Sequence, residues 1–341
     1  MTEPVVKHRP ADFVVRENLV VRLTDQDSAK HQYLLLRKCG YTTMEAVRLV
    51  ADRLGLVSTE ITYGGLKDED GITEQLVALP ANSLPEDVRD SGWTVAADGD
   101  RWLELRHYGY GADPLRIGRL EGNGFRVVVR NLAEDAAARL SGERKLTTFF
   151  LNYYDTQRFG VPGGPKRTHH VGAAILDGRW ADALRELAGL RAPESAGARA
   201  WQDDPRGYFT ALDPRTTSFY LAAHSSVQWN ELLGARVAQV CGAETTTVTV
   251  DGIGYRYATS PTAATRVLAE ATSLPYTRYE FVDGVPVPAE SHRTSVVQTV
   301  ISVGPVEEDN AHDGRSCVEL RFFLPSGCYA TAAIRQLLSY C

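Results

Sequence analysis

The sequence of 341 residues predicts a mixed α and β protein: a mixed sheet with flanking helices, and a more helical second lobe in the middle of the chain. Three observations support this fold class. Phe13 and Val15 alternate with their neighbours as residues of a strand do. A helix-capping pattern begins at Thr42. Helix candidates dominate the stretch 181–240. Two lobes are expected, because a single domain typically has roughly 100–200 residues.

The first part of the chain predicts strands around one helix. Short strands are expected at 12–18 and 31–38. Thr42 and Glu45 have the spacing of a capping box, and Gly55 stands where a left-handed helix end favours glycine. The apolar face of this helix is formed by Ala46, Val47, Val50 and Leu54. Residues 61–80 then predict a strand, a tight loop and a second strand.

The remaining elements follow in order. Residues 101–132 are strand-like at both ends, with Phe125, Val127 and Val129 on one face and Arg126 and Arg130 on the other. Helices are expected at 133–140 and 181–190, with an Ala/Gly/Pro-rich connector at 191–207 and a long helix at about 218–240. The end of the chain predicts a strand, a Pro-Gly loop and a terminal helix.

Composition limits the class of protein. The net charge is −6, which argues against a protein held on nucleic acid by bulk charge alone. No run approaches the roughly 18 apolar residues of a membrane span, and the first residues lack the apolar core of a secretory signal. We therefore expect a soluble, cytoplasmic protein. The five cysteines are scattered, which favours ordinary thiols over a zinc site or disulfides.

The loop Gly64–Gly71 is the first candidate site. It places three carboxylates and one lysine between glycines and between two expected strands. Glycines allow a ligand to approach the backbone closely, so a binding loop competes with a solvated acidic turn. The loop lacks the calcium-binding pattern, and a glycosidase would need a second placed carboxylate. Downstream, the turn at 122–124 leads into Phe125, which suits either a core residue or a site.

A basic and aromatic window spans 144–170. Its five basic residues outnumber one acid, Asp155, which gives a local net charge of +4. Cations bind phosphates, and the aromatic rings of Tyr153, Tyr154 and Phe159 could stack on unpaired bases, so the window suits RNA as well as a solvated basic surface. His169 and His170 do not indicate a metal, because adjacent side chains on a regular element point apart.

Six motifs, taken in order, resemble those of the TruD family of pseudouridine synthases. The resemblance extends from Lys7 to about Leu337. The matching residues are Lys7, Pro10, Asp12, Phe13 and Val15; Gly65 to Asp68 with Thr73 and Gln75; Gly118, Gly122, Asn123 and Phe125 with Arg130; Asn152, Tyr153 and Gln157 to Gly160; Ser226 and Asn230; and Leu324, Pro325, Gly327, Tyr329 to Thr331 and Arg335. Departures from the family pattern are Asp155 for Gly, Gly71 for Ala, Trp229 for Phe and Gln336 for Glu.

The resemblance implies a chemistry without metal or organic cofactor. Asp68 would be the catalytic carboxylate, acting on the ribose as nucleophile or as base in a pocket that excludes water. Lys7 would be the cation that keeps it ionised, while Lys67 points away. The target uridine would flip out and stack on Phe125, beside Asn123. Residues implied in RNA or substrate binding are Lys67, Gln75, Arg130, Asn152, Tyr153, Gln157, Arg158, Phe159, Lys166, Arg167, Arg293 and Arg335.

The resemblance also implies the architecture and the substrate. We expect an α+β pseudouridine synthase catalytic domain, with a mainly antiparallel sheet, formed by residues 1–160 and 291–341. A TruD-specific α/β domain would be inserted at 161–290, and the chain would return to the sheet near His292 and Arg293. Uridine 13 of tRNA is the expected target. Two alternatives stay open: the same chemistry on another RNA or a free nucleotide such as UMP, and a non-catalytic RNA-binding module.

Overall fold

The structure is a computed structural model that describes residues 4–85, 92–142, 145–160 and 164–340. The chain forms two compact units. Unit 1 consists of the chain up to Thr147 together with Thr299–Gly327, and unit 2 consists of Thr148–Gln298 and Cys328–Tyr340. The predicted α+β class, a mainly antiparallel sheet with flanking helices, is confirmed. The predicted domain limits at 160/161 and 290/291 stay a prediction.

The large sheet has the strand order β5-β6-β2-β4-β1-β7-β14-β13-β8, and most of its residues belong to unit 1. Its central strands are β2 (His31–Cys39), β4 (Ile72–Pro80), β1 (Phe13–Asn18), β7 (Gly122–Leu132) and β14 (Ser316–Pro325). The outer strands are β5 (Trp93–Asp98), β6 (Arg101–Gly111), β13 (Val296–Glu308) and β8 (Lys145–Leu151), and the short β3 (Thr62–Tyr63) pairs with β4. β1 and β4 pair in parallel, whereas β1 and β7 are antiparallel.

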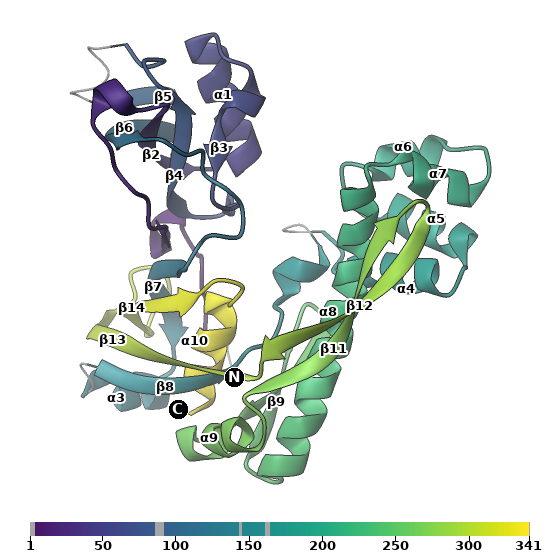
Figure 1. Cartoon of the computed structure of the whole chain (residues 1–341). Helices are drawn as coiled ribbons and strands as arrows, with labels where there is room; N and C mark the ends of the chain where they lie inside the picture. The colour runs from purple at the N-terminus through teal and green to yellow at the C-terminus, as the bar shows by residue number, and fades with distance from the viewer. Residues whose placement is uncertain (1–3, 86–91, 143–144, 161–163, 341) are drawn as a thin grey trace. The chain divides into compact units, whose positions relative to one another are not determined.

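The predicted helix after Thr42 is α1 (Thr43–Leu54), which lies against β2 to β6 in Figure 1. Thr42 accepts a hydrogen bond from the backbone N–H of Glu45, and the Glu45 carboxylate accepts one from the backbone N–H of Thr42, as in a capping box. Gly55 ends the helix with a φ of 66°, in the left-handed region. The apolar face of α1 packs on Leu34 and Leu36 of the sheet. Among the described residues of unit 1, a second α-helix is α3 (Glu134–Ser141).

Unit 2 combines helices with two hairpins, which Figure 1 draws mainly in green, with α10 in yellow. The helices are α4 (Thr168–Leu176), α5 (Trp180–Gly189), α6 (Ser195–Ala200), α7 (Pro205–Ala211), α8 (Pro214–Cys241), α9 (Pro261–Glu270) and α10 (Ala330–Ser339). The hairpins are β9 (Thr245–Val250) with β10 (Ile253–Ala258), and β11 (Ser273–Val282) with β12 (Val285–Thr294). One core surrounds Trp229 of α8, and a second lies among the helices around Phe209.

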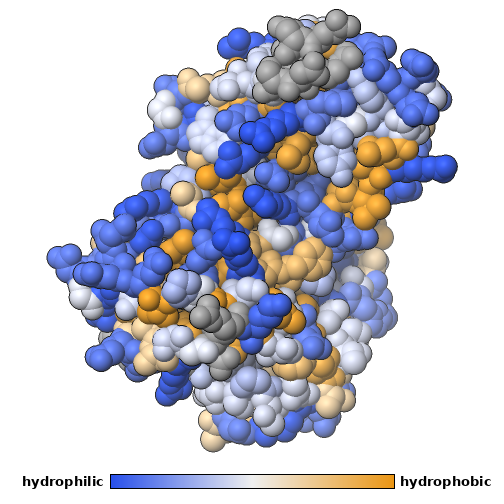
Figure 2. Space-filling model, turned by 90° about the vertical axis from the view of Figure 1, so that its left-hand side faces the viewer, coloured by the Kyte–Doolittle hydropathy of each residue, from blue (hydrophilic) through white to orange (hydrophobic). Residues whose placement is uncertain are grey.

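One expectation for this part of the chain is corrected. The segment 191–207 is not a plain connector, because α6 forms within it and packs Ala198 into the helical core. The return to the large sheet, expected near His292 and Arg293, takes place with β13, which begins at Val296, three residues after Arg293 on β12. Within the described residues, no helix is long and apolar enough to cross a membrane. The face drawn in Figure 2 is mainly hydrophilic and carries scattered hydrophobic patches, as is usual for a folded chain.

Candidate active site

One face of the unit 1 sheet collects the residues that the sequence singled out. The strand registers place Lys38 opposite Thr73, Thr73 opposite Val15, Val15 opposite Phe125, and Phe125 opposite Phe322. Residues that pair directly across a sheet project from the same face. The register therefore places the side chain of Phe125 on the same face of the sheet as Thr73. Thr73 lies at the start of β4, directly after the loop Gly64–Gly71.

Asp68 lies on this loop and faces Lys7. The Lys7 Nζ is 3.4 Å from Asp68 Oδ2, so the predicted pairing is present in the structure. The Lys7 side chain is 14% exposed, whereas that of Asp68 is 53% exposed. The expectation of an Asp68 already enclosed away from water is therefore wrong for the chain without substrate. The exposed Asp68 carboxylate, beside the mostly buried Lys7 cation, is accessible to a large ligand.

A series of rings connects Lys7 to Phe125. Lys7 has a φ of 66°, an uncommon conformation for a residue with a side chain, and its Nζ lies 4.4 Å from the centre of the Phe13 ring. The Phe13 and Phe125 rings meet edge to face at 6.0 Å, and Phe125 stacks on Phe322 at 5.4 Å. Phe125 is half-buried. Three of the four predicted catalytic residues, Lys7, Asp68 and Phe125, thus belong to one continuous cluster.

Asn123, the fourth, lies two residues before Phe125 and pairs with Glu17 across β1 and β7. The Glu17 carboxylate is 2.7 Å from Lys67 Nζ, and both side chains are buried. Lys67 points away from Asp68, as expected. Its assignment to RNA binding is not supported, because its ammonium is enclosed with Glu17. The buried Asn123 Oδ1 has no hydrogen-bond partner in the structure, so it could accept a hydrogen bond from a ligand.

Buried polar side chains form hydrogen bonds with the backbone of the loop Gly64–Gly71. Gln75 Nε2 donates to the Gly65 carbonyl at 2.9 Å, and Thr43 Oγ1 accepts from the Lys67 N–H at 2.9 Å. The Lys38 ammonium donates to the Asp68 carbonyl at 2.8 Å. Gln75 is fully buried and braces the loop, so its expected contact with RNA is not supported.

Sequence reasoning missed four participants: Glu17, Lys38, Thr43 and the ring of Phe13 as a contact of Lys7. The signal available for Lys38 is a lysine at the end of a buried strand, two positions after three consecutive leucines. Lysine is almost never fully buried unless its ammonium has partners, so such a position indicates a specific role.

Several residues that were predicted to bind RNA are buried. Arg130 is 7% exposed and forms ion pairs of 2.8 Å with both Asp12 and Asp309. It is therefore not on a solvated strand face. Tyr153 and Phe159 are 1% and 0% exposed, so neither ring is available to stack on a base. The Tyr153 hydroxyl donates to the Arg256 carbonyl, and burial raises the pKa of Tyr153 well above its usual range.

Asn152, Arg293 and Arg335 connect segments of unit 2. Arg293 donates to the side-chain oxygen of Asn152 at 2.7 Å and stacks over Tyr154 at 4.0 Å. The Asn152 side chain donates in turn to the Thr294 carbonyl. Arg335 pairs with Asp155 at 2.6 Å. Each of these interactions holds chain segments together, and none indicates an RNA contact.

The other predicted RNA-binding residues are more accessible. Gln157 and Arg167 are exposed, and Arg158 and Lys166 are half-buried. Arg167 pairs with Glu186 at 2.8 Å, and the Lys166 ammonium donates to the Gly160 carbonyl. Arg158 lies over the exposed Phe219 ring. Within the window, these four are the accessible members of the set predicted to bind RNA.

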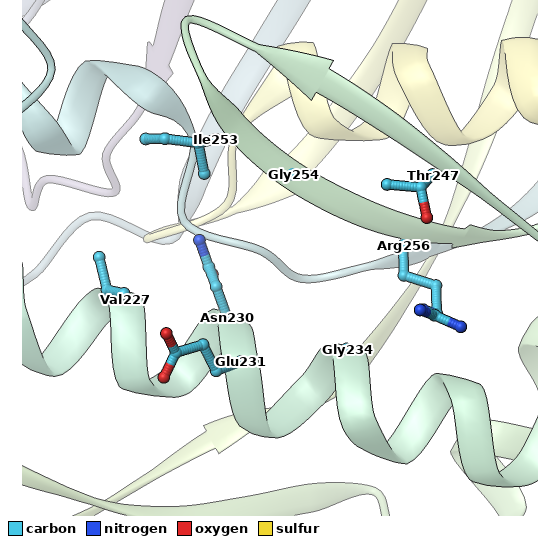
Figure 3. Close-up of a pocket in the computed structure, with 8 residues that line it drawn as sticks. All are labelled: Val227, Asn230, Glu231, Gly234, Thr247, Ile253, Gly254 and Arg256. Carbon is cyan, nitrogen blue, oxygen red and sulfur yellow. The ribbon is translucent and has the colours of Figure 1, made fainter.

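Unit 2 also contains a pocket of about 300 Å³, shown in Figure 3. Its lining comes from one side of α8 and from β9 and β10. The lining residues are Val227, Asn230, Glu231, Gly234, Thr247, Ile253, Gly254 and Arg256. None of the predicted catalytic or RNA-binding residues lines it. Within the described ranges, no cluster of three or more His, Cys, Asp or Glu side chains could hold a metal ion.

Comparison with known proteins agrees with the motif order. The model of the family described as tRNA pseudouridine synthase D (TruD) matches residues 2–203, more than half of the chain. The tRNA pseudouridine synthase D of Geobacter metallireducens is 25% identical over 99% of this chain and 95% of its own length. That of an Anaeromyxobacter species is 27% identical over 98% of this chain and 92% of its own length.

The fold agrees as well. A TruD structure from Methanosarcina mazei superposes with a TM-score of 0.61 over 98% of this chain and 93% of its own, at 17% identity. The family match covers the loop of Asp68, the strand of Asn123 and Phe125, and the basic window. The chain therefore belongs to the TruD family of pseudouridine synthases, which are isomerases.

Proposed function

We propose that this protein converts uridine 13 of tRNA to pseudouridine in the cytoplasm, with Asp68 as the catalytic carboxylate. The observation that carries the proposal is the contact of Asp68 with Lys7, which lies on the same ring cluster as Phe125. The tRNA substrate is taken from the names of the relatives. Uridine 13 is taken from what is typical of the family that the motifs resemble.

The proposed chemistry uses groups that the cluster supplies. The uracil must leave the ribose, turn and rejoin through carbon. Asp68 would act on the ribose as nucleophile or as base, and either role requires the carboxylate to be ionised. The Lys7 ammonium lies 3.4 Å from Asp68 Oδ2 and would balance the negative charge of the carboxylate. The half-buried Phe125 ring would provide the face on which the flipped base stacks.

The accessible basic residues of unit 2 would provide the contacts to the RNA backbone. Arg158, Lys166 and Arg167 are candidates for phosphate contacts, with Gln157 beside them. Because the net charge of the whole chain is −6, RNA binding is expected to be local and sensitive to salt.

The proposal is tested with unmodified tRNA and mapping of pseudouridine by carbodiimide-dependent stops of reverse transcription. Wild-type protein is expected to give a new stop at position 13, and Asp68→Asn is expected to give none while still binding tRNA. Asp70→Asn is the matched control, because Asp70 is an exposed carboxylate of the same loop and should leave activity unchanged.

The outcomes separate the alternatives. No new stop on any tRNA would overturn the tRNA substrate, and a stop at another uridine would overturn position 13 alone. An active Asp68→Asn protein would overturn the catalytic assignment. Turnover of UMP to a C-nucleotide, detected by chromatography, would instead support a free-nucleotide substrate.

A further inference from the structure

Lys38 is a fully buried lysine at the end of β2. Its ammonium donates hydrogen bonds to three backbone carbonyls, those of Tyr41 at 2.7 Å, Lys67 at 3.3 Å and Asp68 at 2.8 Å. An ammonium has three donors and no acceptor, so this arrangement uses its full capacity. Two of the three acceptors belong to the loop that carries Asp68. No ion pair of Lys38 occurs among the described residues, so the carbonyl dipoles are its principal direct partners.

We propose that Lys38 is a positioning residue for catalysis: its buried ammonium fixes the backbone of Lys67 and Asp68 and thereby sets the place of the Asp68 carboxylate opposite Lys7. This inference rests on the proposed catalytic role of Asp68. It concerns a residue that does not face the substrate, since Lys38 is enclosed beneath the loop.

Residues close to Lys38 in the sequence also hold the backbone of the loop. The Thr43 hydroxyl accepts a hydrogen bond from the Lys67 N–H, and the Gly40 N–H donates one to the Glu69 carbonyl at 3.2 Å. The turn that joins β2 to α1 thus contacts consecutive residues of the loop. Because a buried carbonyl without a partner is costly, removal of the ammonium would favour another loop conformation.

Electrostatics also couples Lys38 to the loop. Burial lowers the pKa of the Lys38 ammonium to about 8, while the nearby Asp68 and Glu69 carboxylates act against this shift and Lys67 adds to it. The ammonium therefore stays mostly charged at neutral pH. Its charge attracts the nearby Asp68 carboxylate.

The test compares Lys38→Met with Gln32→Met. Gln32 is a fully buried polar residue of the same strand, and neither its side-chain oxygen nor its side-chain nitrogen has a hydrogen-bond partner in the structure. Lys38→Met is expected to lower the single-turnover rate on tRNA by about 10²-fold, the effect of a misplacement near 1 Å, with the Kd for tRNA unchanged. Hydrogen–deuterium exchange should rise in residues 64–71 of this variant. Gln32→Met should change neither the rate nor exchange in the loop.

Three outcomes decide the proposal. A folded Lys38→Met protein with the wild-type rate or with unchanged exchange in the loop overturns it. Equal losses of rate and of tRNA affinity would also overturn it, since they indicate a general loss of structure. If Lys38→Met does not fold, Lys38→Gln takes its place under the same criteria, because its uncharged amide has two N–H donors and cannot serve all three carbonyls. The loop exchange does not depend on activity, so an active Asp68→Asn protein would refute the proposed function without deciding the loop contact.

Discussion

Asp155 is a departure from the family pattern whose role can be tested by its removal. Its side chain is 1% exposed, and its carboxylate accepts hydrogen bonds from Arg335 at 2.6 Å, from the Thr156 N–H at 2.7 Å and from the Thr331 hydroxyl. The Arg335 side chain is 20% exposed. Asp155 therefore does not belong to an RNA-facing surface.

Replacement of Asp155 by Asn would leave Arg335 without its counter-charge in a mostly buried site. Breaking a buried ion pair by the loss of one partner costs about 3–5 kcal/mol of unfolding free energy. For a unit of the size of unit 2, each kcal/mol lowers Tm by about 2–4 °C, so a fall of about 6–20 °C is expected. Asn can still accept from Thr156, which isolates the effect of charge.

Differential scanning calorimetry of a double-mutant cycle measures this effect. Asp155→Asn and Arg335→Met each leave one buried charge unpaired, whereas the double variant leaves none. The double variant should therefore be more stable than the sum of the single losses predicts, by about 1–3 kcal/mol. Additive losses, or an Asp155→Asn protein with the wild-type Tm, would refute the assignment of Asp155 to a structural ion pair.

Two further predictions concern unit 1. Burial alone would raise the pKa of Asp309, but hydrogen bonds from the Asn131 and Ala311 N–H groups, His312 and Arg130 hold it well below its usual range. This stabilisation is fully present above the pKa of an aspartate in the unfolded chain, which is near 4, and is lost as the pH falls below that value. The urea concentration at the unfolding midpoint should therefore decrease when the pH is lowered below about 4. The decrease should be smaller in Arg130→Met. Phe125→Ala should lower the single-turnover rate by about tenfold or more, with a smaller effect on tRNA affinity. As a control, replacement of the exposed Phe323 on the next strand by Ala should change neither quantity. Equal losses of rate and affinity in Phe125→Ala would indicate a core role for Phe125.

Local sequence signals predicted some, but not all, of the elements that depend on a few adjacent residues. The helix after Thr42 follows from its capping box and Gly55, and both features are present in α1. The β9–β10 and β11–β12 hairpins were not predicted, although each turns on an Asp-Gly pair, Asp251–Gly252 and Asp283–Gly284, with positive φ at both residues. That dipeptide is a strong hairpin signal, so these elements were accessible to sequence reasoning.

Burial of polar and aromatic residues depended on partners far away in the sequence and could not be derived locally. Arg130 alternates like a solvated strand residue, yet Asp12 and Asp309 enclose it from either end of the chain. Gly71 shows the same limit, because only the structure reveals that a Cβ there would lie 2.5 Å from the Phe13 carbonyl oxygen. An alanine at 71, usual in the family, would require β1 and the loop to separate.

The exposure of Asp68 bears on the size of the substrate. The reaction needs a carboxylate shielded from water, because charge interactions strengthen when water is excluded. In the chain without substrate the Asp68 side chain is 53% exposed, and the loop below it is already fixed by Lys38, Thr43 and Gln75. On the proposed catalytic role of Asp68, the bound substrate itself would have to supply this shielding. A folded RNA covers such a surface more completely than a single nucleotide does. The geometry of this loop thus favours RNA over UMP, although the net charge of the chain alone favours neither.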